Sequence, residues 1–430
     1  MPLRLRHAQP DFEAGFRALL AMKREVSADV DEAVRAIVGD VAQRGDPALI
    51  DYTARFDGLT LTPETLRVGA DEVAVARGRC APEALDALRL AHDRIEAYHR
   101  TQLPEDRLAT DALGVTAGWR WTALESAGLY VPGGTASYPS SVLMNAVPAR
   151  VAGVPRLVMV VPTPRGEINP LVLAAAELAG VDEIYRVGGA QAVAALAHGT
   201  ATIPAVAKIV GPGNAYVAAA KRQVFGQVGI DSIAGPSEVL ILADHTANPD
   251  WVAADLLAQA EHDTAAQSIL VTSSPALADA VERAVDAQLA TLPRAEIARA
   301  SWRDHGAIIE VARLGDALPL VDRLAPEHLE IEAEDAEALM AGVRNAGAIF
   351  LGQHTPEAIG DYVGGPNHVL PTARAARYAS GLSVLDFMKR TSILRCDAGA
   401  LRALGPAAIA LGRSEGLEAH ARSVALRLNL

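Results

Sequence analysis

The sequence predicts an α/β protein built from two parallel-sheet units. From Tyr130 onward, short apolar segments of strand length alternate with helical segments, an order typical of parallel sheets with right-handed crossovers. The chain has 430 residues, which is too long for one ordinary core. Glycine and proline concentrate near Tyr130 and Gly235, so we place the boundaries of one unit there.

The first part of the chain is expected to be helical. Residues 1–24 are expected to form a short helical arm. Over residues 29–41, apolar side chains recur at the spacing of an amphipathic helix. A further helix is expected over residues 45–58, which begins with Gly45-Asp46-Pro47 and ends at Gly58. Another is expected over residues 82–102, with Leu85, Leu88, Leu90 and Ile95 as its apolar positions. These helices have no strands of their own, so we expect them to pack on later parts of the chain.

Two alternations of strands and helices follow. In the first, we expect strands at 157–161, 183–187 and 207–210, and helices at 170–179, 190–197 and 214–225. In the second, we expect strands at 239–242, 268–271, 307–311, 328–331 and 348–351. We interpret residues 130–235 as a smaller domain inserted into a larger discontinuous domain of residues 25–129 and 236–381. Residues 382–430 are interpreted as a mostly helical tail.

Composition narrows the class of protein. A net charge of -13 argues against general nucleic-acid binding, which needs basic patches. No apolar run is long enough for a membrane span, and the N-terminus lacks the apolar segment of a signal peptide. The two cysteines, Cys80 and Cys396, form no CxxC pair, which favours a reduced, cytoplasmic protein.

A candidate metal site begins with Gln259 and His262. They lie three residues apart near the end of a helix that starts at Asn248-Pro249, so they share one helix face. Such a pair alone is more often a solvated or capping pair. Asp361, in a glycine-rich loop, and His420, in the tail, would complete a nitrogen and oxygen donor set. That set suits zinc, with manganese or another divalent ion as alternatives.

Other polar stretches are candidates for binding and catalysis. The turns at 187–191 and 210–214 join a strand to a helix, where backbone N–H groups attract phosphate, but a structural turn is an equal alternative. Glu327 and His328 would suit general base chemistry, although a surface turn is the simpler interpretation of that stretch alone. His368 lies in the glycine-rich loop and would bind a polar substrate group.

Taken together, these stretches closely resemble the histidinol dehydrogenase family. The matching segments, in the family's order, are GLYVPGG (128–134), GGAQA (188–192), GPGN (211–214), AGPSE (234–238), QAEHD (259–263), APEHL (325–329), GGPNHVLPT (364–372) and EGL (415–417) followed by His420. The resemblance implies an NAD-dependent, zinc-containing enzyme that oxidises L-histidinol through an aldehyde to L-histidine with two NAD. It also implies two incomplete Rossmann-like domains and an intertwined homodimer.

The same resemblance implies roles for individual residues. Glu327 and His328 match the catalytic pair, in which His328 takes the hydroxyl proton and Glu327 activates water for the aldehyde step. The implied zinc ligands are Gln259, His262, Asp361 and His420, with His420 supplied by the partner chain. The implied substrate contacts are Ser237, His368 and Glu415, together with His328 and the four zinc ligands. The implied dinucleotide contacts are Tyr130, Gln191 and Asn214.

Three alternatives remain at this stage. A related enzyme acting on another small alcohol, such as a sulfonated diol, would share the scaffold. A zinc hydrolase would use the same metal set with a metal-bound water, and would turn over without NAD. A non-catalytic metal-binding protein would leave Glu327 and His328 without a purpose.

Overall fold

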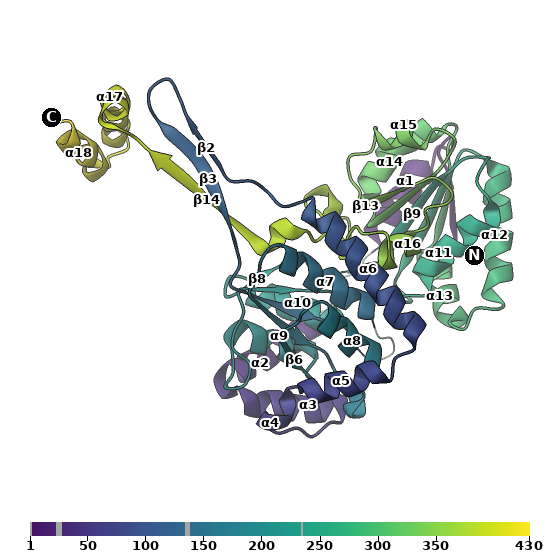
Figure 1. Ribbon diagram of the computed structural model, residues 1–430. Coiled ribbons are helices and arrows are strands. Elements are labelled where there is room, and N and C mark those ends of the chain that lie inside the picture. The colour runs from purple at the N-terminus through teal and green to yellow at the C-terminus, as the bar shows by residue number, and fades with distance from the viewer. Residues whose placement is uncertain (1, 23–27, 134–137, 234) are drawn as a thin grey trace.

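The computed structural model describes residues 2–22, 28–133, 138–233 and 235–430. Two lobes, each a parallel sheet covered by helices, lie side by side, and the C-terminal part extends away from them as an arm (Figure 1). Gly134 and Ala234, which belong to two of the matching segments, lie outside the described residues.

The larger lobe is built on a six-stranded parallel sheet. Its strands, in spatial order, are β1 (Leu3–Arg6), β11 (Ala307–Glu310), β10 (Gln267–Thr272), β9 (Glu238–Ala243), β12 (His328–Glu332) and β13 (Ala348–Leu351). Alternate side chains of β9 face opposite sides, as the two-residue period of a strand requires. Val239 and Ile241 pack in one buried cluster, and Leu240 and Leu242 in another.

Helices cover both faces of this sheet. One face is covered by α11 (Pro249–Ala260), α12 (Pro275–Leu289) and α13 (Ala295–His305). The other is covered by α1 (Phe12–Ala21), η2 (Leu314–Ala317), α14 (Leu318–Leu324) and α15 (Ala336–Met340). Helix α16 (Glu357–Tyr362) follows β13 and contacts α11.

The smaller lobe is built on a five-stranded parallel sheet. Its strands, in spatial order, are β6 (Glu183–Tyr185), β5 (Arg156–Val160), β4 (Ser126–Tyr130), β7 (Lys208–Val210) and β8 (Gly229–Ile230). One face is covered by α5 (Ala70–Gly78), α6 (Pro82–Arg100), α7 (Pro139–Val151) and α8 (Pro170–Leu178). The other is covered by α2 (Ala28–Arg44), α3 (Asp46–Asp57), α9 (Gly189–His198) and α10 (Ala215–Val224). Short helical turns are α4 (Pro63–Leu66) and η1 (Pro164–Gly166).

The helices of residues 28–100 therefore pack with the smaller sheet. This differs from the expected division, which assigned residues 25–129 to the larger domain. Helix α2 contacts α9 and α10, and α6 contacts α7 and α8. The apolar stripe of an amphipathic helix indicates that the helix packs on something, but not on which sheet.

Two strands lie in the ends that were expected to be mainly helical. In the N-terminal arm, β1 precedes α1 and pairs in parallel with β11. In the tail, β14 (Met388–Arg395) forms an antiparallel sheet with β3 (Thr116–Ala123) and β2 (Arg107–Thr110). The tail also contains η4 (Val384–Phe387), α17 (Ala398–Ser414) and α18 (Glu418–Arg427), and η3 (Ala375–Arg377) precedes it.

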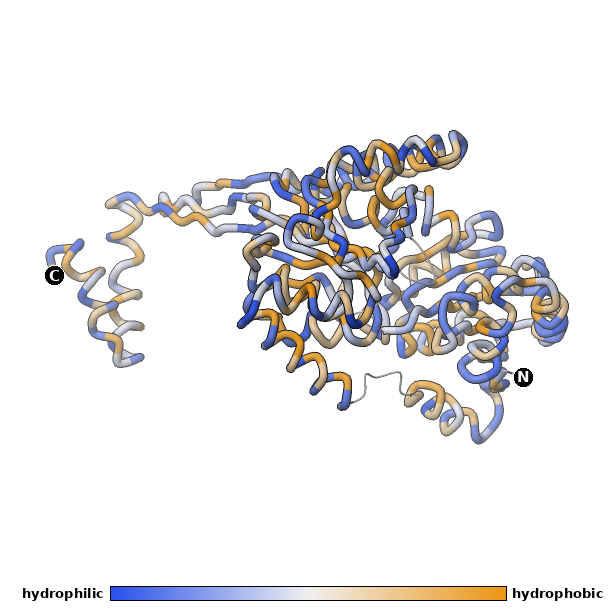
Figure 2. The backbone as a smooth tube through the Cα atoms, turned by 90° about the horizontal axis from the view of Figure 1, so that it is seen from below, coloured by the Kyte–Doolittle hydropathy of each residue, from blue (hydrophilic) through white to orange (hydrophobic). Residues whose placement is uncertain are grey.

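The arm formed by this antiparallel sheet, α17 and α18 projects from the lobes in two perpendicular views (Figures 1 and 2). Large apolar side chains of the two helices are exposed to solvent, among them Leu404, Leu411 and Leu426, as is Leu417 between the helices. The chain itself leaves these side chains uncovered.

Candidate active site

His328 occupies the centre of the candidate site, at the amino-terminal end of β12. Its ring is buried, and Nδ1 lies 3.0 Å from the backbone carbonyl oxygen of Glu238. A carbonyl only accepts hydrogen bonds, so Nδ1 carries the proton and Nε2 keeps its lone pair. Nε2 has no hydrogen-bond partner among the described residues and lies 3.8 Å from Asp361 Oδ1.

The environment keeps the His328 ring neutral. Burial lowers the pKa of His328 to about 3, against the hydrogen bond to Glu238, and the neighbouring rings of His368 and His262 lower it further. A neutral imidazole with an unoccupied Nε2 is a proton acceptor. The geometry therefore suits His328 for general base chemistry.

Glu327 lies beside His328 and is also buried. Its Oε2 accepts a hydrogen bond from the backbone N–H of Glu238 at 3.0 Å and lies 3.9 Å from His328 Nδ1. Burial raises the pKa of Glu327 well above its usual range, against the hydrogen bonds from Glu238 and the Ser237 side chain. A carboxyl with a raised pKa is a strong base once it is ionised, which suits it to accept a proton from water.

The chain reaches this pair through a strained turn. Ala325, the residue after α14, has a φ of 46°, in the left-handed region that residues other than glycine seldom occupy. Such strain is typical of functional sites, where the surrounding structure holds the backbone in place. The turn directs the chain into β12 and places Glu327 just before, and His328 at, the amino-terminal end of that strand.

Glu357 is a site residue that the sequence analysis missed. It is buried on α16, and its Oε1 lies 3.7 Å from His328 Nδ1. Burial raises the pKa of Glu357 well above its usual range, and burial likewise raises the pKa of Asp361 to about 7. Glu357 and Asp361 are four residues apart and so share one helix face, a spacing that was visible in the sequence.

Gln259 is a buried side chain whose polar atoms are available to bind a ligand. It is fully buried at the end of α11, and within the described part of the chain neither its Oε1 nor its Nε2 has a hydrogen-bond partner. Leaving a buried amide unpaired costs about 1–3 kcal/mol, so an occupant of the site would relieve that cost. His262 follows α11, is exposed, and lies close enough to His328 and His368 to lower the pKa of both rings.

These donors fit a divalent cation. Gln259, His262 and Asp361 offer an amide oxygen, an imidazole nitrogen and a carboxylate, the nitrogen and oxygen donors that zinc and related ions bind. A tighter group in the described residues consists of His328, Glu357 and Asp361, whose donor atoms all lie within 4.8 Å of one another. Only Asp361 belongs to both groups, and we favour the first because it is the set that the family resemblance implies.

His368 joins the two lobes at this site. Its Nδ1 donates to the backbone carbonyl of Asp361 at 3.0 Å, and its Nε2 accepts from the hydroxyl of Ser141, on α7 of the smaller lobe, at 3.3 Å. Burial lowers the pKa of His368 to about 4. The structure thus brings Ser237, Glu327, His328, Asp361 and His368 into one region.

Glu415 and His420 do not join this region within the chain. Both are exposed, Glu415 directly after α17 and His420 on α18, in the arm that extends from the lobes (Figure 1). The chain therefore does not bring these two side chains to the other candidate residues.

The candidate dinucleotide residues lie at the carboxyl ends of the strands of the smaller sheet, where ligands bind in such sheets. Tyr130 is the last residue of β4. Its hydroxyl accepts a hydrogen bond from the Gly189 N–H at 2.9 Å, and burial raises the pKa of Tyr130 to about 12. Gln191 is buried in the first turn of α9, two residues after Gly189. Asn214 caps α10, where its Oδ1 accepts from the backbone N–H groups of Tyr216 and Val217.

Comparison with known proteins identifies the family. The family model described as histidinol dehydrogenase matches residues 20–428. The chain belongs to the histidinol dehydrogenase family. It is 71% identical over 430 residues to the histidinol dehydrogenase of Bradyrhizobium diazoefficiens and 70% identical over 429 residues to that of Rhodopseudomonas palustris, with both chains covered completely in each case.

A solved structure of the family has the same fold. The crystal structure of histidinol dehydrogenase from Elizabethkingia anophelis matches with a TM-score of 0.95 at 35% identity, covering 100% of this chain and 98% of that one. The expected resemblance and the mixed α/β fold with parallel sheets and helical ends are confirmed. Membership of this family makes the chain an oxidoreductase that acts on a CH–OH group in histidine biosynthesis. The alternatives of a zinc hydrolase and of a non-catalytic metal-binding protein are therefore wrong.

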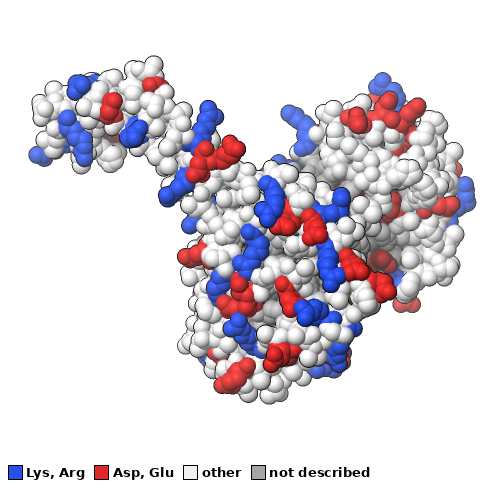
Figure 3. Space-filling view, viewed as in Figure 1, with Lys and Arg blue, Asp and Glu red and all other residues white. Residues whose placement is uncertain are grey.

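The helices and the surface charge bear on whether the chain binds a membrane or nucleic acid. Among the described residues, no helix has both the length and the apolar character to cross a membrane. Basic and acidic side chains are interspersed over the face seen in Figure 3. The expectation that the chain binds no nucleic acid stays a prediction.

Proposed function

We propose that this chain oxidises L-histidinol through L-histidinaldehyde to L-histidine, with two molecules of NAD and one zinc ion per subunit. The observation that carries the proposal is the neutral, buried His328, whose Nε2 is free to accept a proton beside a buried Glu327. The family supports the substrate and the reaction. A cytoplasmic location stays our expectation.

His328 acts in both oxidation steps. Its Nε2 removes the proton of the substrate hydroxyl as the carbon gives up hydride, and the Nδ1 hydrogen bond to Glu238 holds the ring in the tautomer that this requires. NAD supplies the acceptor for each hydride. After the first step the product is an aldehyde, and it must gain water before a second hydride can leave.

Glu327 activates the water molecule that adds to the aldehyde. As a carboxylate it accepts a proton from a water molecule, whose oxygen then bonds to the aldehyde carbon. His328 returns the proton it took in the first step to the carbonyl oxygen, which completes the hydrate. The hydrate loses its hydroxyl proton to His328 and its hydride to the second NAD, which yields the acid. Two hydrogen-bond donors, the Glu238 N–H and the Ser237 side chain, keep the Glu327 carboxylate oriented.

Gln259, His262 and Asp361 would hold the zinc ion together with His420 of the partner subunit. The bound ion would supply a Lewis acid that accepts lone pairs from the imidazole and amine nitrogens of the substrate and so holds it in place. Ser237, His368 and Glu415 are proposed as further substrate contacts, so the zinc ligands and these residues line one pocket. Tyr130, Gln191 and Asn214 are proposed to contact NAD.

The position of the tail supports our proposal that the enzyme is a homodimer. Glu415 and His420 lie on an arm that leaves its own lobes, and the exposed leucines of that arm form an apolar surface suited to a second copy of the chain. In a twofold dimer each arm would then reach the site of the other chain, and both sites would be completed equally.

A substrate panel tests the proposal. We expect metal-replete enzyme to reduce NAD with histidinol and not with simple or sulfonated diols. NAD reduction with a diol alone would show that the chain serves another small alcohol. No NAD reduction with any alcohol would refute the proposed function.

A further inference from the structure

A buried ion pair lies next to the turn of residues 211–214, whose last residue, Asn214, is a proposed NAD contact. It joins Lys221, on α10, to Asp231, which follows β8. The two side chains are 2% and 5% exposed. Neither residue takes part in the chemical steps described above, so the burial of two opposite charges here calls for another reason.

Both partners of the pair bind Gly211, the first residue of the turn. Asp231 Oδ2 accepts a hydrogen bond from the Gly211 N–H at 2.8 Å, and Lys221 Nζ donates to the Gly211 carbonyl at 3.0 Å. Both backbone polar groups of one residue are therefore bound by one ion pair. Such charge-assisted hydrogen bonds are stronger and more directional than neutral ones.

Gly211 is also packed closely against the strand that carries Tyr130. Its φ is 112°, which favours glycine, and a Cβ at this position would clash with the carbonyl oxygen of Tyr130. The turn thus lies between the ion pair on one side and β4 on the other. It ends at Asn214, which caps α10, the helix that carries Lys221.

Burying an ion pair is not by itself an efficient way to stabilise a fold, because desolvation offsets the attraction of the charges. Apolar side chains would fill the space as well, but they could not bind the N–H and the carbonyl of Gly211. We propose that Lys221 and Asp231 are positioning residues that hold the 211–214 turn in the shape that receives the dinucleotide. This inference rests on the proposed function, since Tyr130 and Asn214 are proposed NAD contacts.

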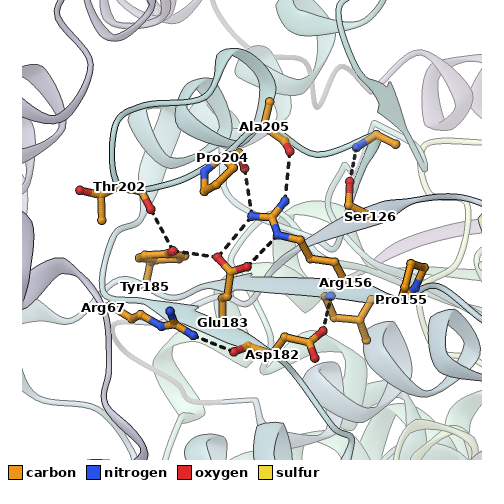
Figure 4. Close-up of polar contacts among 12 residues, drawn as sticks. Arg67, Ser126, Pro155, Arg156, Asp182, Glu183, Tyr185, Thr202, Pro204 and Ala205 are labelled. Carbon is orange, nitrogen blue, oxygen red and sulfur yellow. Dashed lines mark hydrogen bonds and ion pairs between the residues drawn. The ribbon is translucent and has the colours of Figure 1, made fainter.

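A second ion pair in the same lobe provides a matched control. Arg156 Nε binds Glu183 Oε1 at 2.7 Å, and the same guanidinium donates to the carbonyls of Pro204 and Ala205 (Figure 4). This pair also joins a cation to a carboxylate and to backbone carbonyls. It lies at the amino-terminal ends of β5 and β6, at the opposite edge of the sheet from the 211–214 turn.

The test compares Lys221→Met with Arg156→Met in metal-replete enzyme. We expect Lys221→Met to raise the KM for NAD and the Kd for NADH on the order of tenfold, the effect of losing one charge-assisted hydrogen bond. The kcat at saturating NAD should stay within about twofold of the wild-type value. Arg156→Met should lower the Tm and leave the KM for NAD unchanged. Lys221→Gln keeps an N–H donor for the Gly211 carbonyl and should raise the KM for NAD by only about threefold.

Two outcomes would overturn the inference. One is a Lys221→Met enzyme whose Tm falls while its KM for NAD stays at the wild-type value, as in the control. If Lys221→Met does not fold, Lys221→Gln is compared with Arg156→Gln instead. An equal KM for NAD in these two variants would be the second outcome that overturns the inference. A wild-type enzyme that fails to bind NADH in a fluorescence titration would instead refute the proposed function, and that measurement needs no variant.

Discussion

Replacing Glu327 by glutamine separates the two oxidation steps. The amide keeps an oxygen that accepts the Glu238 N–H, which Glu327 Oε2 now accepts at 3.0 Å, so the local geometry should persist. The amide cannot accept a proton from water. Because general base catalysis contributes typically 10²–10⁴-fold, we expect the rate of aldehyde oxidation to fall by about that factor. Oxidation of the alcohol, which relies on His328, should change by less than about threefold.

Single-turnover kinetics with excess NAD measure both steps in one trace. The wild-type enzyme should form both equivalents of NADH without a lag between them. Glu327→Gln should form one equivalent at nearly the normal rate and the second slowly, and it should be slow from the start with histidinaldehyde as substrate. Equal slowing of the two equivalents would refute the assignment of water activation to Glu327.

A matched control for this variant is Glu332→Gln. Glu332 is a buried carboxyl on the same strand, β12, and within the described residues neither of its carboxylate oxygens has a hydrogen-bond partner. It is not part of the proposed catalytic machinery. Both NADH phases of Glu332→Gln should therefore match those of the wild type, which would show that loss of a buried charge on β12 does not by itself slow the aldehyde step.

Three further predictions follow from the site. Burial, aided by the charge of Asp255, raises the pKa of Glu332 from 4.5 to about 7. Between pH 4.5 and pH 7 the folded state therefore binds more protons than the unfolded state. The free energy of unfolding consequently falls as the pH rises through this window. Denaturant unfolding should therefore show Glu332→Gln equal to the wild type at pH 4 and more stable at pH 8, by up to about 3 kcal/mol; no gain at pH 8 would contradict the raised pKa. His262→Asn should lower zinc content and activity together, measured by metal analysis and NADH formation, whereas lost activity with normal zinc would make His262 a catalytic base. A heterodimer of one His262→Asn chain and one His420→Asn chain should recover about half of the wild-type activity, because one of its two sites is intact when the tail ligand is shared; an inactive heterodimer would place both ligands in the same chain.

Much of the fold could be predicted because buried strands and helix ends leave local signals. The apolar run expected at 157–161 is β5 at Arg156–Val160, and the helix starting at Asn248-Pro249 is α11. The packing partner of the helices in residues 28–100 could not be predicted, since an apolar stripe fits either sheet. The strand β14 was missed because most of its residues are polar or exposed and it pairs with β3, which is distant in the sequence.

The site was predictable only in part for a related reason. His328 and Asp361 are 33 positions apart in the sequence, and only folding brings His328 Nε2 to 3.8 Å from Asp361 Oδ1. Their expected roles came from matching family motifs, while Glu357 lay in no motif and was missed although it contacts the same ring. The arm shows why His420 looked isolated in the sequence: it is also isolated in the folded chain.

The stoichiometry of NAD reduction is the sharpest test of the proposed two-step oxidation of L-histidinol. Metal-replete enzyme is given a limiting amount of L-histidinol with excess NAD, and NADH and histidine are measured at completion. We expect two NADH and one L-histidine per L-histidinol consumed. One NADH with accumulated aldehyde, or none, would contradict it.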